Sequence, residues 1–264
     1  MIDILSGRGA AAIGEAGARG ALLAFDFDGT LAPLTAARAD ARMRESTRLL
    51  LRAIALVYPT AVISGRARSD VARRVIGAPL VAIVGNHGAE ALSGSPPPRI
   101  QRRVREWAAA LREPLAQVNG IEVEDKGYTL SIHCRRCARP DDARRRILEA
   151  ATPLPQARVH AGHAIVNVCP VELPTKGAAV ETLVRRLAAP MAVYVGDDVT
   201  DEDAFASSAV NVSIRIGRSD ESSARYFLPR QEDVDALLEA LVLARARRAR
   251  GGHAPRKART GGAE

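Results

Sequence analysis

The chain has 264 residues, 38 basic and 30 acidic side chains, and a formal net charge of +8. This length suits one large domain or two smaller ones, and 47% hydrophobic residues is the composition of a globular protein. Collagen, coiled coil and disorder throughout the chain are therefore excluded. Aromatic residues make up only 3%, which disfavours binding of single-stranded nucleic acid, because such proteins stack bases on aromatic side chains.

The positive charge is concentrated near the C-terminus. Residues 245–264 contain seven basic side chains and one acidic one, so they hold six of the eight net charges. The other 244 residues are nearly neutral, and we predict no specific nucleic-acid partner. Only Lys126, Lys176 and Lys257 are lysines, while all other basic residues are arginines. Each lysine within the folded part is therefore more informative than a typical arginine.

Cysteine content and hydropathy predict a protein of the reducing cytoplasm. Cys134, Cys137 and Cys169 are too few for a disulfide framework, and their number is odd. A zinc site would need a second Cys-x-x-Cys or a histidine pair at matching spacing, which is lacking, so we predict buried thiols. No apolar run approaches the roughly 20 residues of a membrane span, and the first residues lack the apolar segment of a signal peptide. We expect a cytoplasmic monomer without membrane contact.

Short apolar runs alternate with helical patterns along much of the chain. The runs lie at 21–27, 60–64, 80–85, 191–196 and 209–214. The helical patterns lie at 44–57, 69–76, 176–189 and 231–248. Both faces of the runs are apolar, as expected for parallel strands that helices cover on each side. This order predicts an α/β fold with a doubly wound parallel sheet.

The middle of the chain has a different pattern. A Pro-rich linker at 94–98 precedes an arginine-rich helix at 99–118, and a second helix is predicted at 140–151. Strands with alternating polarity are predicted at 121–124 and 128–135, and apolar-patterned strands are predicted near 157–161 and 164–169. One face of the first two strands is polar, with Glu122, Glu124, Thr129, Ser131, His133 and Arg135. We therefore predict a smaller α+β cap domain inserted into the core domain.

These patterns set the predicted boundaries. The core domain comprises residues 1–96 and 173–243, and the cap domain comprises 97–172. Residues 244–264 are low in apolar content and are predicted to form a disordered basic tail.

Two carboxylates stand where the first predicted strand ends, in Asp26-Phe27-Asp28-Gly29-Thr30-Leu31. Ligands of open α/β sheets bind at the carboxyl ends of the strands. Asp26 and Asp28 lie two residues apart, so one could act as a nucleophile while the other transfers a proton. The competing interpretation is an ordinary Asp-Gly turn.

A second acidic group, residues 197–203, follows the strand at 191–196. Five carboxylates in seven positions would repel one another without a cation, and oxygen ligands of this density suit Mg²⁺. The alternative is that Asp201 and Glu202 open a helix, although this leaves Asp197 and Asp198 unexplained.

Two further strand and helix ends carry groups that could bind phosphate. Ser64-Gly65-Arg66 stands at a strand end and could offer a hydroxyl and backbone N–H groups, although for this tripeptide alone a plain turn is the better explanation. Lys176 opens a predicted helix, where the helix dipole disfavours a cation, so it is expected to face an anion. The alternative is a solvated surface lysine.

Together these motifs resemble the haloacid dehalogenase superfamily of phosphotransferases. With Gly85-Asn86-His87-Gly88-Ala89-Glu90 and the segment 124–135, they resemble in particular the trehalose-6-phosphate phosphatase family. The resemblance implies a Rossmannoid core, a mobile α/β cap between the second and third motifs, and hydrolysis of trehalose 6-phosphate to trehalose and phosphate.

The resemblance also implies roles for individual residues. Asp26 would attack phosphorus to form an aspartyl-phosphate, and Asp28 would protonate the sugar oxygen and then activate water. Mg²⁺ would be held by Asp26, the backbone carbonyl of Asp28, and Asp197, with Asp198 and Asp201 in support. Ser64, Gly65 and Lys176 would hold the phosphoryl group. The substrate-binding residues implied are Arg66, Asn86, His87, Glu124, Lys126, Arg135 and Glu172.

Two other functions remain open. A phosphatase for another phosphorylated sugar, of the sucrose phosphate or mannosylglycerate phosphate type, would share the core motifs and differ in the cap. An inactive sugar-phosphate-binding regulatory domain is the alternative from another class. Against it, Asp26, Asp28, Lys176 and Asp197 are all intact, and an inactive domain has no chemical need for all four.

Overall fold

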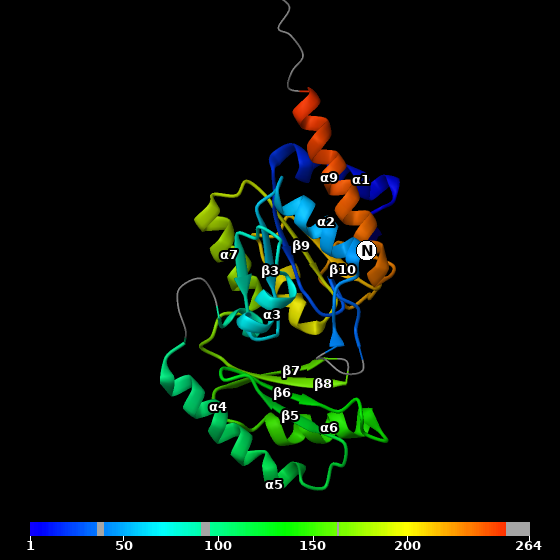
Figure 1. Cartoon of the computed structure of the whole chain (residues 1–264). Helices are drawn as coiled ribbons and strands as arrows, with labels where there is room; N and C mark the ends of the chain where they lie inside the picture. Colours follow the sequence, from blue (N-terminus) through cyan, green and yellow to red (C-terminus); the bar gives the residue numbers. More distant parts are fainter. Residues whose placement is uncertain (36–39, 91–95, 163, 252–264) are drawn as a thin grey trace, which may run out of the picture.

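The computed structural model describes residues 1–35, 40–90, 96–162 and 164–251, which form a large sheet and a small one (Figure 1). The strands of the large sheet are β1 (Ile2–Asp3), β2 (Leu22–Phe25), β3 (Thr60–Ile63), β4 (Ala82–Val84), β9 (Ala192–Gly196), β10 (Val212–Ile216) and β11 (Tyr226–Leu228). They are all parallel, in the order β1-β11-β10-β9-β2-β3-β4.

Helices cover both faces of the large sheet. They are α1 (Gly7–Arg19), α2 (Glu45–Ala55), α3 (Arg68–Arg74), α7 (Lys176–Leu187), α8 (Glu202–Phe205) and α9 (Val234–Gly251). The side chains of β2 alternate between the two faces of the sheet. Leu23 and Phe25 pack in the apolar core formed with α1, α2, α3 and α9. Leu22 and Ala24 point the other way, into the core formed with α7 and α8. Because side chains alternate along a strand, two apolar faces require this two-sided covering, and the predicted doubly wound sheet is confirmed.

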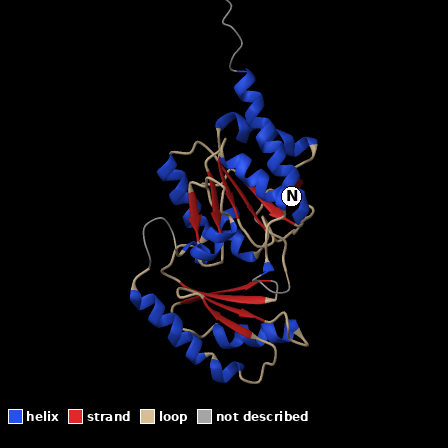
Figure 2. Ribbon diagram, viewed as in Figure 1, coloured by secondary structure: helices blue, strands red, loops and turns tan. Residues whose placement is uncertain are grey.

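The small sheet is antiparallel, with the order β5-β6-β8-β7. Its strands are β5 (Glu122–Asp125), β6 (Leu130–His133), β7 (Ala157–Gly162) and β8 (Ile165–Pro170). Helices α4 (Pro98–Ala110), α5 (Arg112–Leu115) and α6 (Pro140–Ala151) cover one face, around the buried Trp107. The strands of the large sheet point toward the small sheet, whose helices lie on its far side (Figure 2). We call this inserted α+β unit the cap and the large sheet with its helices the core.

The structure adds elements that the sequence pattern did not predict. Strand β1 pairs with β11 at one edge of the large sheet, and helix α1 packs against α9. The close approach of the two helices depends on Gly17, where a Cβ atom would lie 2.7 Å from the Cβ of Ala244. In the cap, the predicted helix 99–118 is divided into α4 and α5.

The prediction of a disordered tail over residues 244–264 is wrong for residues 244–251, which are helical. Helix α9 continues to Gly251, while residues 252–264 lie outside the described residues. Alanine and arginine are good helix formers, and Arg245 fastens this segment to the core. Its Nη1 donates to the carbonyl of Gly17 at 3.1 Å, and its guanidinium carbon lies 5.6 Å from the ring centroid of Tyr58. Within the described ranges, no helix combines the length and apolar character needed to span a bilayer.

Candidate active site

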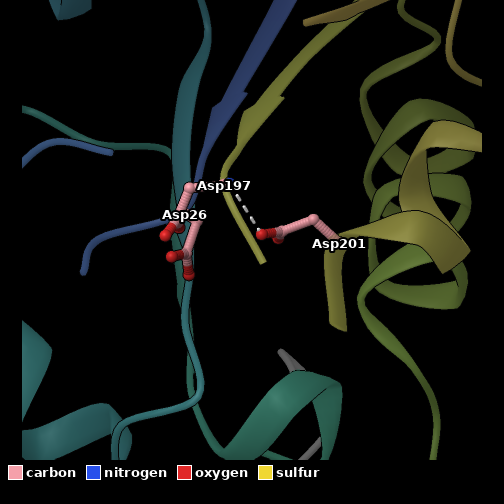
Figure 3. A group of neighbouring side chains, drawn as sticks. All are labelled: Asp26, Asp197 and Asp201. Carbon is pink, nitrogen blue, oxygen red and sulfur yellow. Dashed lines mark hydrogen bonds between the residues drawn. The ribbon is translucent and has the colours of Figure 1, made fainter. Parts of the chain in front are cut away.

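The predicted site residues of the core come together because their strands are neighbours. Asp26 follows β2, Ser64 follows β3 and Asp197 follows β9, and β2 lies between the other two strands. Since the strands are parallel, their carboxyl ends meet at one edge of the sheet. Figure 3 shows Asp26 and Asp197 side by side at this edge, with Asp201 directed toward Asp197.

Gly29 allows the two acidic loops to touch. Its φ is +77°, in the left-handed region, and a Cβ atom there would lie 2.0 Å from Asp197 Oδ2. Any other residue at this position would both strain the turn and push the Asp197 carboxylate away. The glycine of the first motif therefore serves the approach of Asp197 as well as the turn itself.

Lys176 lies at the centre of the acidic group and is only 2% exposed. Its Nζ donates to Asp26 Oδ1 at 2.9 Å and to Asp201 Oδ1 at 2.7 Å. Helix α7 begins at Lys176, and the hydroxyl of Thr175 caps its first turn by accepting from the backbone N–H of Ala178. Burial opposes the charge of the lysine, but the two carboxylates outweigh burial and raise its pKa above the ordinary value. This cation therefore faces anions, as its helix-terminal position predicts.

Asp201 holds the loop after β9 in place through hydrogen bonds to its backbone. Its Oδ2 accepts hydrogen bonds from the backbone N–H groups of Asp197 at 3.0 Å and Asp198 at 2.9 Å. Its Oδ1 accepts from the hydroxyl of Tyr194 at 2.6 Å as well as from Lys176. With four donors on two oxygens, this fully buried carboxylate is suited to holding the loop that presents Asp197. Sequence reasoning missed Tyr194, because a tyrosine inside an apolar strand reads as core.

The electrostatics of the group favour a bound cation. Asp26, Asp197 and Asp201 can each offer one oxygen, with all three atoms within 4.8 Å of one another. Burial, with a contribution from Asp201, raises the pKa of Asp26 to about 7 against the opposing effect of Lys176. Burial and the charges of Asp26 and Asp201 raise the pKa of Asp197 well above its ordinary value. One lysine does not balance three carboxylates, and an all-oxygen donor set fits Mg²⁺.

A cavity of about 620 Å³ lies between the acidic group and the cap. Its lining includes Asp26, Asp28, Gly65, Arg66, His87, Lys176, Asp197 and Asp198 from the core. Its lining from the cap includes Glu122, Glu124, Lys126, His133, Arg135, Arg136 and Asn167. The polar face predicted for the first cap strands is therefore the face that meets the core, with Glu122 opposite His133 and Glu124 opposite Ser131 in register.

Hydrogen bonds join the cap to the core around this cavity. Lys126 Nζ donates to the carbonyl oxygen of Gly65 at 2.8 Å. Asn86, buried at the core side, accepts from the Thr129 hydroxyl at 2.9 Å and donates from Nδ2 to the Lys126 carbonyl at 3.4 Å. Both ends of the Asn86 amide thus contact the hairpin turn between β5 and β6.

Three residues assigned to the substrate or phosphate by resemblance lie apart from the cavity surface. Ser64 and Asn86 are buried beneath it, and the Ser64 hydroxyl accepts from the backbone N–H of Arg66 at 3.2 Å. Glu172 is not among the lining residues, and its carboxylate pairs with Arg103 of α4 at 2.5 Å. Arg66 does line the cavity, but its guanidinium contacts the carboxylates of Asp28 and Asp70.

The sequence and the fold are similar to those of known proteins. A protein described as probable trehalose-phosphate phosphatase D of Arabidopsis thaliana is 27% identical over 245 residues, covering 83% of this chain and 66% of its own length. The fold is similar to a solved C-terminal domain of Candida albicans trehalose-6-phosphate phosphatase, with a TM-score of 0.73, 20% identity and coverage of 88% of this chain and 96% of that one. A Bacteroides thetaiotaomicron phosphatase of the haloalkanoate superfamily gives a TM-score of 0.57 at 16% identity, covering 85% of this chain and 94% of that one.

The chain spans 53–66% of the length of the first three curated relatives, all from plants. The family model described as trehalose-phosphatase matches residues 24–232, a range that begins just before Asp26, includes the cap and ends after the acidic loop. Since that match takes in every motif gathered at the cavity, the chain belongs to the trehalose-phosphatase family.

Proposed function

We propose that the protein hydrolyses trehalose 6-phosphate to trehalose and phosphate. The observation that carries the proposal is the position of Asp26. Its carboxylate contacts a buried lysine and lies in an acidic group at the floor of a cavity that a polar cap surface covers. Such a site offers an anionic nucleophile below and hydroxyl-binding side chains above, which is what a phosphorylated disaccharide requires.

In the proposed reaction, an oxygen of Asp26 forms a bond to phosphorus while the bond from phosphorus to the sugar oxygen breaks. Asp28 gives its proton to the departing sugar oxygen. In the second half, Asp28 takes a proton from water, whose oxygen attacks the aspartyl-phosphate, releasing phosphate and restoring Asp26. Lys176 and Gly65, which line the cavity, would hold the phosphoryl group, and Lys176 would offset its charge in a loose transition state.

The donor set fits Mg²⁺, as the excess of buried carboxylates indicates. Asp26, the backbone carbonyl of Asp28, and Asp197 would hold the ion, with Asp198 and Asp201 supporting them. When bound, the ion would neutralise negative charge on the phosphoryl oxygens and on the carboxylates beside them.

The experiment that tests this function is a substrate panel. In Mg²⁺, we expect phosphate release from trehalose 6-phosphate with a higher kcat/KM than from sucrose phosphate, mannosylglycerate phosphate or glucose 6-phosphate. EDTA should abolish the release and added Mg²⁺ should restore it, since the single charge of Lys176 does not balance the acidic group. A higher kcat/KM for another sugar phosphate would contradict the substrate assignment, and no release from any substrate would favour a binding domain.

Lys126 is the cap residue whose removal should affect the sugar most specifically. It extends from the cap hairpin across the cavity to Gly65. We expect Lys126→Ala to lower kcat/KM for trehalose 6-phosphate by on the order of 10²-fold, because a charged hydrogen-bond donor is lost on one side of the bound sugar. The kcat/KM for p-nitrophenyl phosphate, which has no sugar, should change far less.

The matched control is Arg139→Ala, which removes a cation of the cap that is 82% exposed and not part of the cavity lining. This variant should match wild type on both substrates. Equal losses on both substrates for Lys126→Ala would rule out a sugar-specific role for Lys126.

A further inference from the structure

Arg66 is a buried charge at the cavity whose hydrogen bonds are directed at protein carboxylates. It is 3% exposed, although it contributes to the lining. Its Nε donates to Asp28 Oδ2 at 2.7 Å and its Nη2 donates to Asp28 Oδ1 at 2.6 Å. Two parallel bonds from one guanidinium to one carboxylate fix the rotation of that carboxylate as well as its position.

Arg66 is itself held from the opposite side. Its Nη1 donates to Asp70 Oδ2 at 2.8 Å, and its guanidinium carbon lies 5.6 Å from the centroid of the Phe27 ring. Asp70, on α3, also accepts from Arg74 Nε at 3.2 Å. The hydrogen bond to Asp70 of α3 therefore fixes the position of the Arg66 guanidinium, and the guanidinium in turn fixes the Asp28 carboxylate.

We propose that Arg66 is a positioning residue that acts through Asp28 and does not bind the phosphoryl group or the sugar. This inference rests on the proposed function, in which Asp28 supplies the proton to the departing oxygen. The bidentate contact occupies one lone pair on each oxygen and leaves another on each for the proton. As the phosphorus–oxygen bond breaks and the proton passes to the leaving oxygen, Asp28 becomes the carboxylate that Arg66 already pairs with. Arg66 thus orients the acid and stabilises the charge that proton transfer creates.

The basicity of the leaving group separates this role from substrate binding. The p-nitrophenolate ion is stable and departs without a proton, whereas phenolate is more basic and a sugar alkoxide is the most basic of the three. Phenyl and p-nitrophenyl phosphate are similar in size and have no sugar to contact the cap. A defect in the acid therefore slows phenyl phosphate more than p-nitrophenyl phosphate, and a merely structural defect slows both alike. The ratio of their kcat/KM values, which report phosphoryl transfer up to the first irreversible step, is the diagnostic quantity.

The experiment measures kcat/KM of the Mg²⁺-loaded protein for these two aryl phosphates and for trehalose 6-phosphate. For Arg66→Met, we expect a loss on the order of 10²-fold for phenyl phosphate and trehalose 6-phosphate, and less than about threefold for p-nitrophenyl phosphate. Asp28→Asn should change the ratio in the same direction, and adding Arg66→Met to Asp28→Asn should change it no further. Arg66→Lys keeps the charge but loses the fork, so it should retain most of the defect; it also replaces Arg66→Met if that variant does not fold.

The matched control is Arg73→Met. Arg73 also contacts Asp70, at 3.3 Å, but is 69% exposed and outside the cavity lining, so the ratio should stay at the wild-type value. Equal losses on all three substrates for Arg66→Met would show that Arg66 either binds the phosphoryl group or only maintains the structure of the site, and a loss confined to trehalose 6-phosphate would show that it binds the sugar. Either result overturns the inference.

The two hypotheses fail in different ways. If wild type turns over the aryl phosphates with the expected ratios but not trehalose 6-phosphate, the substrate assignment fails and the role of Arg66 stands. If Asp28→Asn changes the ratio and Arg66→Met does not, only the role of Arg66 fails. If Asp28→Asn itself leaves the ratio unchanged, the acid role of Asp28 fails and the inference about Arg66 fails with it.

Discussion

Asp26→Asn should abolish turnover of trehalose 6-phosphate, with kcat falling on the order of 10⁴-fold or more, because an amide cannot serve as the nucleophile. The same substitution should leave the protein as stable as wild type or more stable. Burial and neighbouring carboxylates raise the pKa of Asp26 to about 7, so the ionised carboxylate is held at a cost that the neutral amide does not bear. The amide oxygen can still accept the hydrogen bond from Lys176.

Two measurements check this outcome. Chemical denaturation compares the free energies of unfolding, and acid quenching of wild type during turnover should yield a phosphorylated peptide that contains Asp26. The control is Asp28→Asn with p-nitrophenyl phosphate, which should still form the phosphorylated peptide and accumulate it, because the base for the water step is lost. Turnover by Asp26→Asn within about a hundredfold of wild type, or phosphorylation at another residue, would exclude Asp26 as the nucleophile.

Lys176→Met should be the most destabilising single change at the site. It leaves the carboxylates of Asp26 and Asp201 buried without their cation, and removal of one partner from a buried ion pair costs about 3–5 kcal/mol. We expect a loss of that size in the free energy of unfolding, measured by urea denaturation in EDTA so that no metal ion offsets the carboxylates. Hydrolysis of trehalose 6-phosphate should also fall sharply, since the phosphoryl group loses a cation.

The control for Lys176→Met is a double-mutant cycle with Asp201→Asn. The double variant should lose less free energy of unfolding than the sum of the losses of the two single variants. Each single variant leaves one charge of the Lys176–Asp201 pair buried without its partner, whereas the double variant removes both charges of that pair. Additive losses, or a loss below about 1 kcal/mol for Lys176→Met alone, would mean that the ion pair is not what stabilises this part of the core.

The sequence carried enough information to predict the scaffold of the site. Apolar runs long enough to be recognised end at Asp26, Ser64 and Asp197, and parallel strands bring such ends to one edge. Lys176 stood out because a lysine is rare in this chain and opposes the helix dipole at its position. The small antiparallel unit followed from the alternating pattern of its strands. These features are local, and each leaves a signal in a few consecutive residues.

Other features depend on partners far away in the chain. Strand β1 is two residues long, and helix α1 is built largely of alanine and glycine, so both contribute few large apolar side chains. Both are formed by pairing with β11 and α9 at the other end of the chain. Likewise, no local pattern indicates that Arg66 contacts Asp28, or that Glu172 pairs with Arg103. Many oppositely charged residues in the chain could pair with such a side chain, and the actual partner is known only from the three-dimensional structure.

The order of the strands also has a consequence for how the chain reaches its native state. Strand β2 is hydrogen-bonded to β9, and Asp26 meets Lys176 across 150 positions of sequence. During synthesis β2, β3 and β4 emerge well before β9, so the edge of β2 that pairs with β9 stays unpaired while the whole inserted unit is made. The cap, by contrast, is one continuous segment with an apolar core of its own around Trp107. Assembly of the core is thus dominated by distant contacts, which are slow to form, and the Asp26 carboxylate remains in water until the last third of the chain arrives.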